Sequence, residues 1–243
     1  MTAFSSEDPV LVDVTRQTDA LLEAVSDLTD ADVAEPSLCP GWTRGHVLTH
    51  VARNADALTR LLAGAAVGEQ WPMYHENPSR EQEIEAGAGR SIAELEADIE
   101  ASADRFLATC ADLPPAALDN VVRLRNGREY PARQVPWLRW REVVLHHLDL
   151  DTGFDLATAG PLVQRLLAES IEALSRKPDA PNLRVVAADT GRTWTLGDSG
   201  NEPALVVSGR SGGLLGWVSG RTDGDDLDRT PEGGKLPVLP PWG

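Results

Sequence analysis

The sequence predicts an α+β protein in which an N-terminal four-helix bundle, residues 1–152, precedes a smaller α+β domain, residues 153–243. Three observations support this prediction. Before residue 152, caps, glycines and prolines delimit long helical segments, the first of which repeats its apolar residues with the 3.6-residue period of a helix. Shorter segments rich in Val, Thr and Trp, separated by Gly and Asp, follow residue 180 and are typical of strands. A chain of 243 residues is long enough for two modest domains with real cores.

The first two long helices are expected at about 9–28 and 43–65. In the first, apolar residues from Leu11 onward follow the helical period, and Pro9 suits a position in the first turn. A loop at 35–42, which contains two prolines, separates the two helices. Thr43 offers an N-cap for the second helix, and two glycines, at 64 and 68, end it.

Two further long helices and a hairpin complete the first domain. Ser91 and Glu94 form a capping-box pattern ahead of a helix that runs to about Cys110. Ser79 is expected to start a further helix, which glycines at 87 and 89 weaken. The Asn-Gly pair at 126–127 predicts a short β-hairpin over about 121–128, and the fourth long helix is expected at about 132–150.

The second domain mixes short helices and strands. Helices are expected at about 161–175 and 211–218, and strands at about 183–188, 192–196 and 204–208. The tail, 222–243, is rich in Gly, Pro and Asp and is expected to run extended over the surface.

Composition excludes several classes of partner. With 22 basic and 38 acidic residues the formal charge is −16, so neither nucleic acid nor an anionic membrane surface is an expected partner. No apolar stretch has the length of a transmembrane helix, and residues 1–9 lack the features of a secretory signal. Two cysteines, Cys39 and Cys110, cannot make a disulfide framework or a four-cysteine zinc site. We therefore expect a cytoplasmic protein, and its acidic surface is consistent with a monomer.

Four of the five histidines lie in two pairs on predicted helices. Glu142 and His146 are four residues apart, which places them on one helical face, where a carboxylate and an imidazole can share a divalent ion. His46 and His50 have the same spacing, and either could complete a His-His-Glu set with an open fourth position. Taken alone, each spacing is more typical of a solvated or hydrogen-bonded pair than of a metal site. Asp149 could support a ligand histidine through a hydrogen bond, or it could simply end its helix.

Two segments resemble a known family. Gly-Trp-Thr-Arg-Gly-His-Val-Leu-Thr-His-Val-Ala-Arg-Asn, at 41–54, is similar to the first metal-binding helix of the mycothiol-dependent maleylpyruvate isomerases. These enzymes belong to the DinB-like metal-binding bundle proteins. Arg-Glu-Val-Val-Leu-His-His-Leu-Asp-Leu, at 141–150, is similar to the second metal motif. Trp-Pro-Met-Tyr at 71–74 and Arg221 also resemble that family, and the resemblance extends over nearly the whole chain.

The resemblance implies a set of site residues. It assigns His50, Glu142 and His146 as the zinc ligands, and it gives the open position to the thiol of mycothiol. It also implies that Arg221, from the second domain, contributes to the active site as a catalytic residue. Tyr74 and Arg80, in and beside the third familiar segment, are expected to contact the thiol cofactor. Among the tryptophans, those at 42, 71 and 140 are candidates to line the pocket.

The implied reaction is the conversion of maleylpyruvate to fumarylpyruvate. A thiolate adds to the conjugated double bond, the resulting single bond rotates, and elimination restores the alkene in the trans form. Three other functions stay open. A mycothiol S-transferase would use the same zinc and thiol on another electrophile. A non-catalytic zinc sensor could recruit His46 as a fourth ligand, and a zinc hydrolase would need Asp149 as its base.

Overall fold

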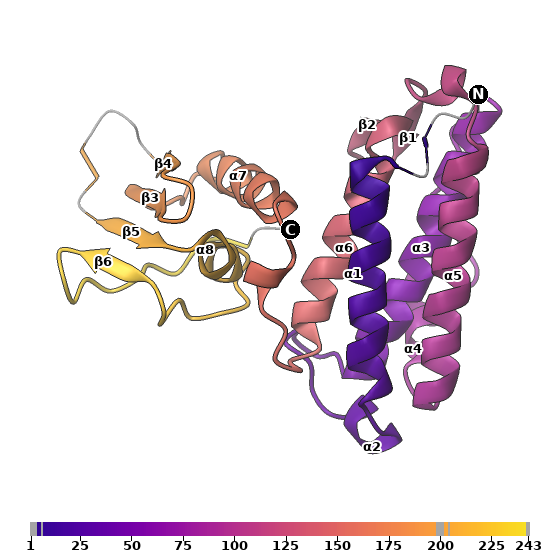
Figure 1. Cartoon of the computed structure of the whole chain (residues 1–243), viewed down its shortest axis with the longest axis horizontal. Helices are drawn as coiled ribbons and strands as arrows, with labels where there is room; N and C mark the ends of the chain where they lie inside the picture. Colours follow the sequence, from indigo (N-terminus) through magenta and orange to yellow (C-terminus); the bar gives the residue numbers. More distant parts are fainter. Residues whose placement is uncertain (1–3, 6, 198–201, 204, 242–243) are drawn as a thin grey trace. The chain divides into compact units, whose positions relative to one another are not determined.

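The computed structural model describes residues 4–5, 7–197, 202–203 and 205–241. The chain divides into two compact units, Met1–Thr152 and Gly153–Gly243, which are shown in Figure 1. Helices dominate the first unit, and the second combines helices with a small sheet, so the predicted α+β class is confirmed. In the described residues, no helix combines the length and the apolar character needed to cross a membrane.

Four long helices form the first unit, as predicted. Helix α3 packs against α5 and α6, and α1 packs against the same two helices, so α1 and α3 occupy opposite corners of the bundle. The bounds of the four are α1 (Pro9–Ser26), α3 (Arg44–Ala66), α5 (Ile92–Asp112) and α6 (Val135–Asp149).

The expected helix starts are confirmed by their caps. The side chains of Thr43, Ser79 and Ser91 each accept a hydrogen bond from the backbone amide three residues later, in a capping box. Ser79 thereby starts α4 (Arg80–Gly87), which ends at Gly87. A further capping box at Thr29 starts the single-turn α2 (Asp30–Val33), which we did not predict.

Helix α4 lies unusually close to α3 because glycines stand at the contact. A Cβ atom at Gly45 of α3 would lie 2.1 Å from the carbonyl oxygen of Ala88, which follows α4. A Cβ atom at Gly87 would lie 2.5 Å from Cγ2 of Thr49 on α3. The close approach fixes α4, and with it Arg80 at the start of this helix, against the first two turns of α3.

The link between α5 and α6 carries the predicted hairpin. Val122 pairs with Tyr130 in an antiparallel register, and Gly127 adopts a φ of +80° at the tip, which glycine accommodates without strain. The elements of this link are the 3₁₀ turn η1 (Pro115–Ala117), β1 (Val121–Arg123), β2 (Glu129–Pro131) and the 3₁₀ turn η2 (Ala132–Gln134).

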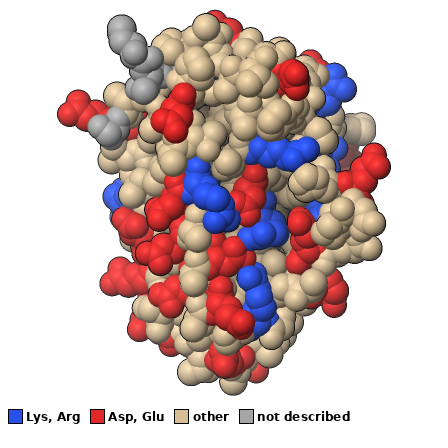
Figure 2. All heavy atoms as spheres, turned by 90° about the vertical axis from the view of Figure 1, so that its right-hand side faces the viewer, with Lys and Arg blue, Asp and Glu red and all other residues tan. Residues whose placement is uncertain are grey.

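Ion pairs join α3 to α5 on an otherwise acidic exterior. Asp98 of α5 accepts from Arg53 of α3 and from Arg90, while Arg105 of α5 reaches Asp56 of α3 at 2.7 Å. Figure 2 shows the α5 side of Figure 1, where basic side chains lie in a band among acidic ones. The basic residues on this face are thus interleaved with acidic ones and form no continuous positive surface.

The second unit is a four-stranded sheet with two main helices. The strand order is β4-β3-β5-β6, in which β3 and β5 are parallel and the other pairs antiparallel, and α7 packs against α8 and β4. The elements are η3 (Leu156–Thr158), α7 (Leu162–Ser175), β3 (Leu183–Ala187), β4 (Thr193–Leu196), β5 (Val206–Gly209), α8 (Ser211–Val218) and β6 (Asp228–Thr230).

The tail of the chain departs from the prediction. The expectation of an extended tail throughout 222–243 is wrong for β6, which pairs with β5 in the register Val207 to Arg229. A three-residue edge strand leaves no period in the sequence, and its Asp and Arg conceal it among turn residues. Ala204, at the start of the third expected strand, lies outside the described residues.

Candidate functional site

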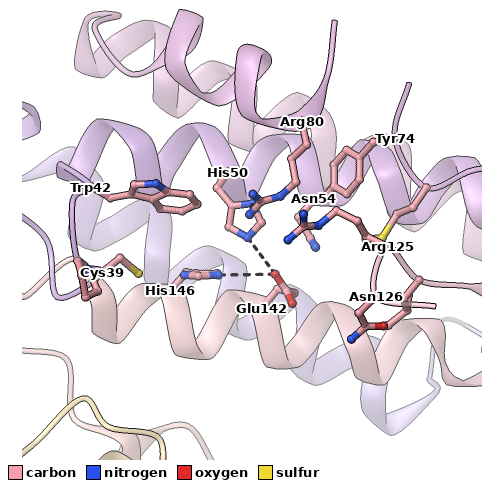
Figure 3. A pocket seen from close by; sticks show the side chains of 13 residues that line it. Cys39, Trp42, His50, Asn54, Tyr74, Arg80, Arg125, Asn126, Glu142 and His146 are labelled. Atoms are coloured by element: carbon pink, nitrogen blue, oxygen red, sulfur yellow. Dashed lines mark hydrogen bonds and ion pairs between the residues drawn. The ribbon is translucent and has the colours of Figure 1, made fainter. Parts of the chain in front are cut away.

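The structure brings together the three residues that the resemblance assigns as zinc ligands. His50 comes from α3, and Glu142 and His146 lie one turn apart on α6 (Figure 3). Glu142 Oε2 lies 3.1 Å from Nε2 of His50 and 3.6 Å from Nε2 of His146. The ligand atoms of the three residues all lie within 4.8 Å of one another, as atoms around one ion must.

His46 does not join this group. Its Nδ1 accepts from the backbone amide of Thr43 as part of the capping box that starts α3, and its Nε2 lies 3.2 Å from Glu85. Within the described residues, the groups that could hold a metal ion exclude His46. The geometry therefore gives no support to a sensor with His46 as fourth ligand.

Asp149 fixes the orientation of His146. Its Oδ2 lies 2.8 Å from Nδ1 of His146, and only 1% of its side chain is exposed. This contact leaves Nε2 of His146 facing Glu142. Asp149 is not among the residues that line the cavity, so it is badly placed as the base of a hydrolase.

The protonation of the group follows from its neighbours. Burial alone would raise the pKa of Glu142, but hydrogen bonds with His146 and His50 outweigh it and hold this pKa well below its usual value. Burial would lower the pKa of His146, yet Asp149, Cys39 and Glu142 together raise it well above its usual value. For His50, burial and the nearby charge of His146 dominate and lower the pKa to about 4. His50 is therefore neutral, whereas a metal ion bound through His146 would have to displace the proton there.

The donor set fits zinc. Two imidazole nitrogens and one carboxylate oxygen are the usual ligands of a catalytic zinc ion, and a set of three leaves one position for an exchangeable ligand. Glu142 keeps 35% of its side chain exposed, and it faces a cavity of about 380 Å³ that also contacts both histidines. An ion held by the three residues would therefore be open to a ligand from this cavity.

Tyr74 and Arg80, the expected cofactor contacts, both line this cavity. Arg80 donates from Nη2 to Nδ1 of His50 at 3.1 Å. Its guanidinium lies 5.5 Å from the ring centroid of Trp42 and 5.9 Å from that of Tyr74. Burial raises the pKa of the Tyr74 hydroxyl, and the charge of Glu142 adds to this effect. The aromatic rings thus hold Arg80 beside the metal-ligand set.

The candidate tryptophans and Arg221 lie in different environments. Trp42 lines the cavity, Trp71 lines a neighbouring hollow, and Trp140 is fully buried in the core, so it cannot line the pocket. Arg221 follows α8 in the second unit, where its Nη1 donates to the carbonyl oxygen of Ser219 at 3.2 Å. Its part in the active site stays a prediction.

Sequence reasoning missed several residues that line the cavity. Asn54 could have been predicted from the sequence, because it lies four residues after His50 and therefore on the same face of α3. Arg125 and Asn126 could not, since only the folded hairpin brings its tip to the cavity. Cys39 likewise reaches His146 only through the path of the 35–42 loop, where the amide of Leu38 donates to the carbonyl oxygen of Asp149.

Comparison with known proteins agrees with the sequence resemblance. The family model of the mycothiol maleylpyruvate isomerase N-terminal domain matches residues 14–151. A crystal structure of a mycothiol-dependent maleylpyruvate isomerase superposes with a TM-score of 0.88 at 28% identity, over 97% of this chain and 96% of that chain. A histidine-to-alanine variant of a mycothiol-dependent maleylpyruvate isomerase gives a TM-score of 0.87 at 27% identity, over the same shares of each chain. No curated protein matches the chain. The chain therefore belongs to the family defined by the mycothiol maleylpyruvate isomerase N-terminal domain.

Proposed function

We propose that the protein is a zinc- and mycothiol-dependent isomerase that converts maleylpyruvate to fumarylpyruvate. The observation that carries the proposal is the open set of His50, Glu142 and His146 at a cavity. It stands in a chain that resembles a mycothiol-dependent maleylpyruvate isomerase over 97% of its length. We further expect the protein to act in the cytoplasm as a monomer.

The chain's own residues have separable tasks. His50, Glu142 and His146 would hold the zinc ion, and Asp149 keeps Nδ1 of His146 occupied so that Nε2 is presented. When bound, zinc would lower the pKa of a coordinated thiol, so that the reactive thiolate is present at neutral pH.

The reaction requires a nucleophile, room for rotation and stabilisation of negative charge. Thiolate addition to the conjugated double bond, rotation about the new single bond and elimination would give the trans product. Trp42 and Tyr74 line the cavity in which this reaction would occur. We assign Arg221 to a carboxylate of the substrate or to the enolate oxygen that develops on addition, because a guanidinium offers paired donors to either.

The decisive experiment measures fumarylpyruvate formation by zinc-loaded protein with and without mycothiol. We expect turnover only when the thiol is present. Protein that holds zinc and mycothiol but leaves maleylpyruvate unchanged would contradict the isomerase. S-conjugation of a different electrophile by that protein would then identify a mycothiol S-transferase.

A further inference from the structure

Two arginines from different elements share one carboxylate oxygen beside the cavity. Nη1 of Arg80, at the start of α4, and Nη1 of Arg125, at the tip of the β1–β2 hairpin, each lie 3.4 Å from Oε1 of Glu81. Charge-assisted pairs of this kind are normally about 2.7–2.9 Å long. Glu81 is 62% exposed. Both contacts are therefore weak, and solvent or a ligand can replace this carboxylate.

The arginine pair stands where two hollows meet. Both side chains line the cavity that contains the metal-ligand set, and both also line a neighbouring hollow of about 500 Å³. Glu81 lines only the neighbouring hollow. Figure 3 shows the two arginines approaching the space near Glu142 from different parts of the chain. A ligand carboxylate that replaced the carboxylate of Glu81 could therefore lie closer to the metal-ligand set and still contact both arginines.

The positive charge of the two guanidiniums is only partly cancelled, because they share the one exposed carboxylate of Glu81. Among the cavity residues, the acidic ones are Glu142, which the two histidines engage, and, in the adjoining hollow, Glu81. Arg123 of the same hairpin differs, because its Nε and Nη2 bind Oε1 of Glu129 at 3.1 and 2.6 Å. In a chain of charge −16, the Arg80–Arg125 pair is therefore a local site for an anion.

Zinc loading would free Arg80 further. In this structure Nδ1 of His50 accepts from Arg80, because a guanidinium can only donate. A neutral histidine that binds an ion through Nε2 carries its proton on Nδ1 and no longer accepts there. Arg80 then loses this acceptor while it stays between the rings of Trp42 and Tyr74, ready for another one.

We propose that Arg80 and Arg125 form a carboxylate clamp that selects electrophiles with two carboxylates, and that Glu81 occupies the clamp until such a substrate enters. This inference rests on the proposed function, since it names the part of the site that recognises the dianionic substrate. Arg80 is preordered by its aromatic neighbours, so little side-chain entropy is lost when it binds.

The test compares Arg125→Gln with Arg128→Gln in the full zinc-loaded protein. Arg128 is an exposed arginine of the same hairpin that lines neither hollow, so it matches the change in charge. Calorimetric titration without thiol uses maleate as the dicarboxylate. Crotonate, which has one carboxylate, shows how much of the affinity the second carboxylate of maleate supplies. We expect Arg125→Gln to weaken maleate binding about 10-fold or more, as for loss of one charge-assisted hydrogen bond.

The controls fix the interpretation. Arg128→Gln should bind maleate like the parent, and Arg125→Gln should keep its zinc content. Glu81→Gln, which removes the competing charge, should bind maleate more tightly than the parent. Equal maleate affinity of Arg125→Gln and Arg128→Gln, or no maleate binding by the parent, would overturn the clamp.

Isomerase activity is scored separately. Parent protein that binds maleate through Arg125 but does not isomerise maleylpyruvate would support the clamp and refute the proposed reaction. Parent protein that isomerises while Arg125→Gln retains both its KM and its maleate affinity would support the reaction and refute the clamp.

Discussion

Asp149 acts on the set of His50, Glu142 and His146 through the histidine that it holds. It is almost completely buried and bonds Nδ1 of His146 at 2.8 Å. We expect Asp149→Asn to lower zinc affinity by about 10–100-fold while the bundle stays folded, as for other residues that orient a ligand histidine. Competition with a chelator measures this. Asp151→Asn changes an exposed carboxylate two residues away and should leave zinc affinity as in the parent.

The two cysteines should differ sharply in reactivity. Burial, helped slightly by Asp8, raises the pKa of Cys110 to about 12, so at pH 8 this residue is almost entirely the unreactive thiol. Cys39 is half-buried and lines the cavity. An alkylating reagent at pH 8 should therefore modify one thiol per native chain, and Cys39→Ser should abolish that labelling. Labelling of Cys110 in folded protein would contradict the burial described.

For single residues, the sequence predicts which types of side chain could bind a metal ion. It is less informative about which histidine does so. The spacing of Glu142 and His146 predicts a shared helical face, and the structure places both at the cavity. The choice of His50 over His46 depended on family resemblance, although Thr43 gives a local reason: a histidine at the third helical position can cap that threonine. Arg125 could not be predicted, because a tertiary contact brings the hairpin tip to the cavity.

Among the elements, α4 depends most on a single close contact. A methyl group at Gly45 would meet the carbonyl oxygen of Ala88 at 2.1 Å and Cγ1 of Val33 at 2.8 Å. Gly45→Ala should therefore lower the free energy of unfolding by about 1–3 kcal/mol, because the backbone must shift. Urea denaturation measures the change. Gly89→Ala, where a Cβ atom would meet nothing within 4 Å, should stay within about 0.5 kcal/mol of the parent.

Helices and strands that have a local sequence pattern were predicted. Short elements that depend on tertiary contacts were not. The long helices α1, α3 and α5 follow from periodicity and helix-start residues, and the hairpin follows from its Asn-Gly turn. The short strand β6 has neither signal, since it exists by pairing with β5. Helix α2 did have a capping box, Thr29 with Asp32, but a single turn offers too few residues to show a period.

At the scale of the whole molecule, the proposed mechanism draws on both units. The metal ligands belong to the first unit, whereas Arg221 belongs to the second. We expect Arg221→Ala to retain zinc and to lose turnover by about 100-fold or more, which is typical for removal of a group that stabilises developing charge. Metal analysis and steady-state kinetics measure both quantities. Kinetics equal to those of the parent would mean that Arg221 takes no part in the reaction.

The acidic exterior has a consequence for how fast anionic reactants arrive. A charge of −16 repels a dianion over a Debye length of about 30 Å in 10 mM salt, but only about 8 Å in 150 mM salt. The encounter rate should therefore rise with ionic strength, in contrast to enzymes that steer their substrates electrostatically. We expect kcat/KM to increase between these salt concentrations. A decrease in kcat/KM would mean that attraction by the arginines at the cavity outweighs repulsion by the net charge of the protein. The local potential at the cavity entrance would then determine the encounter rate.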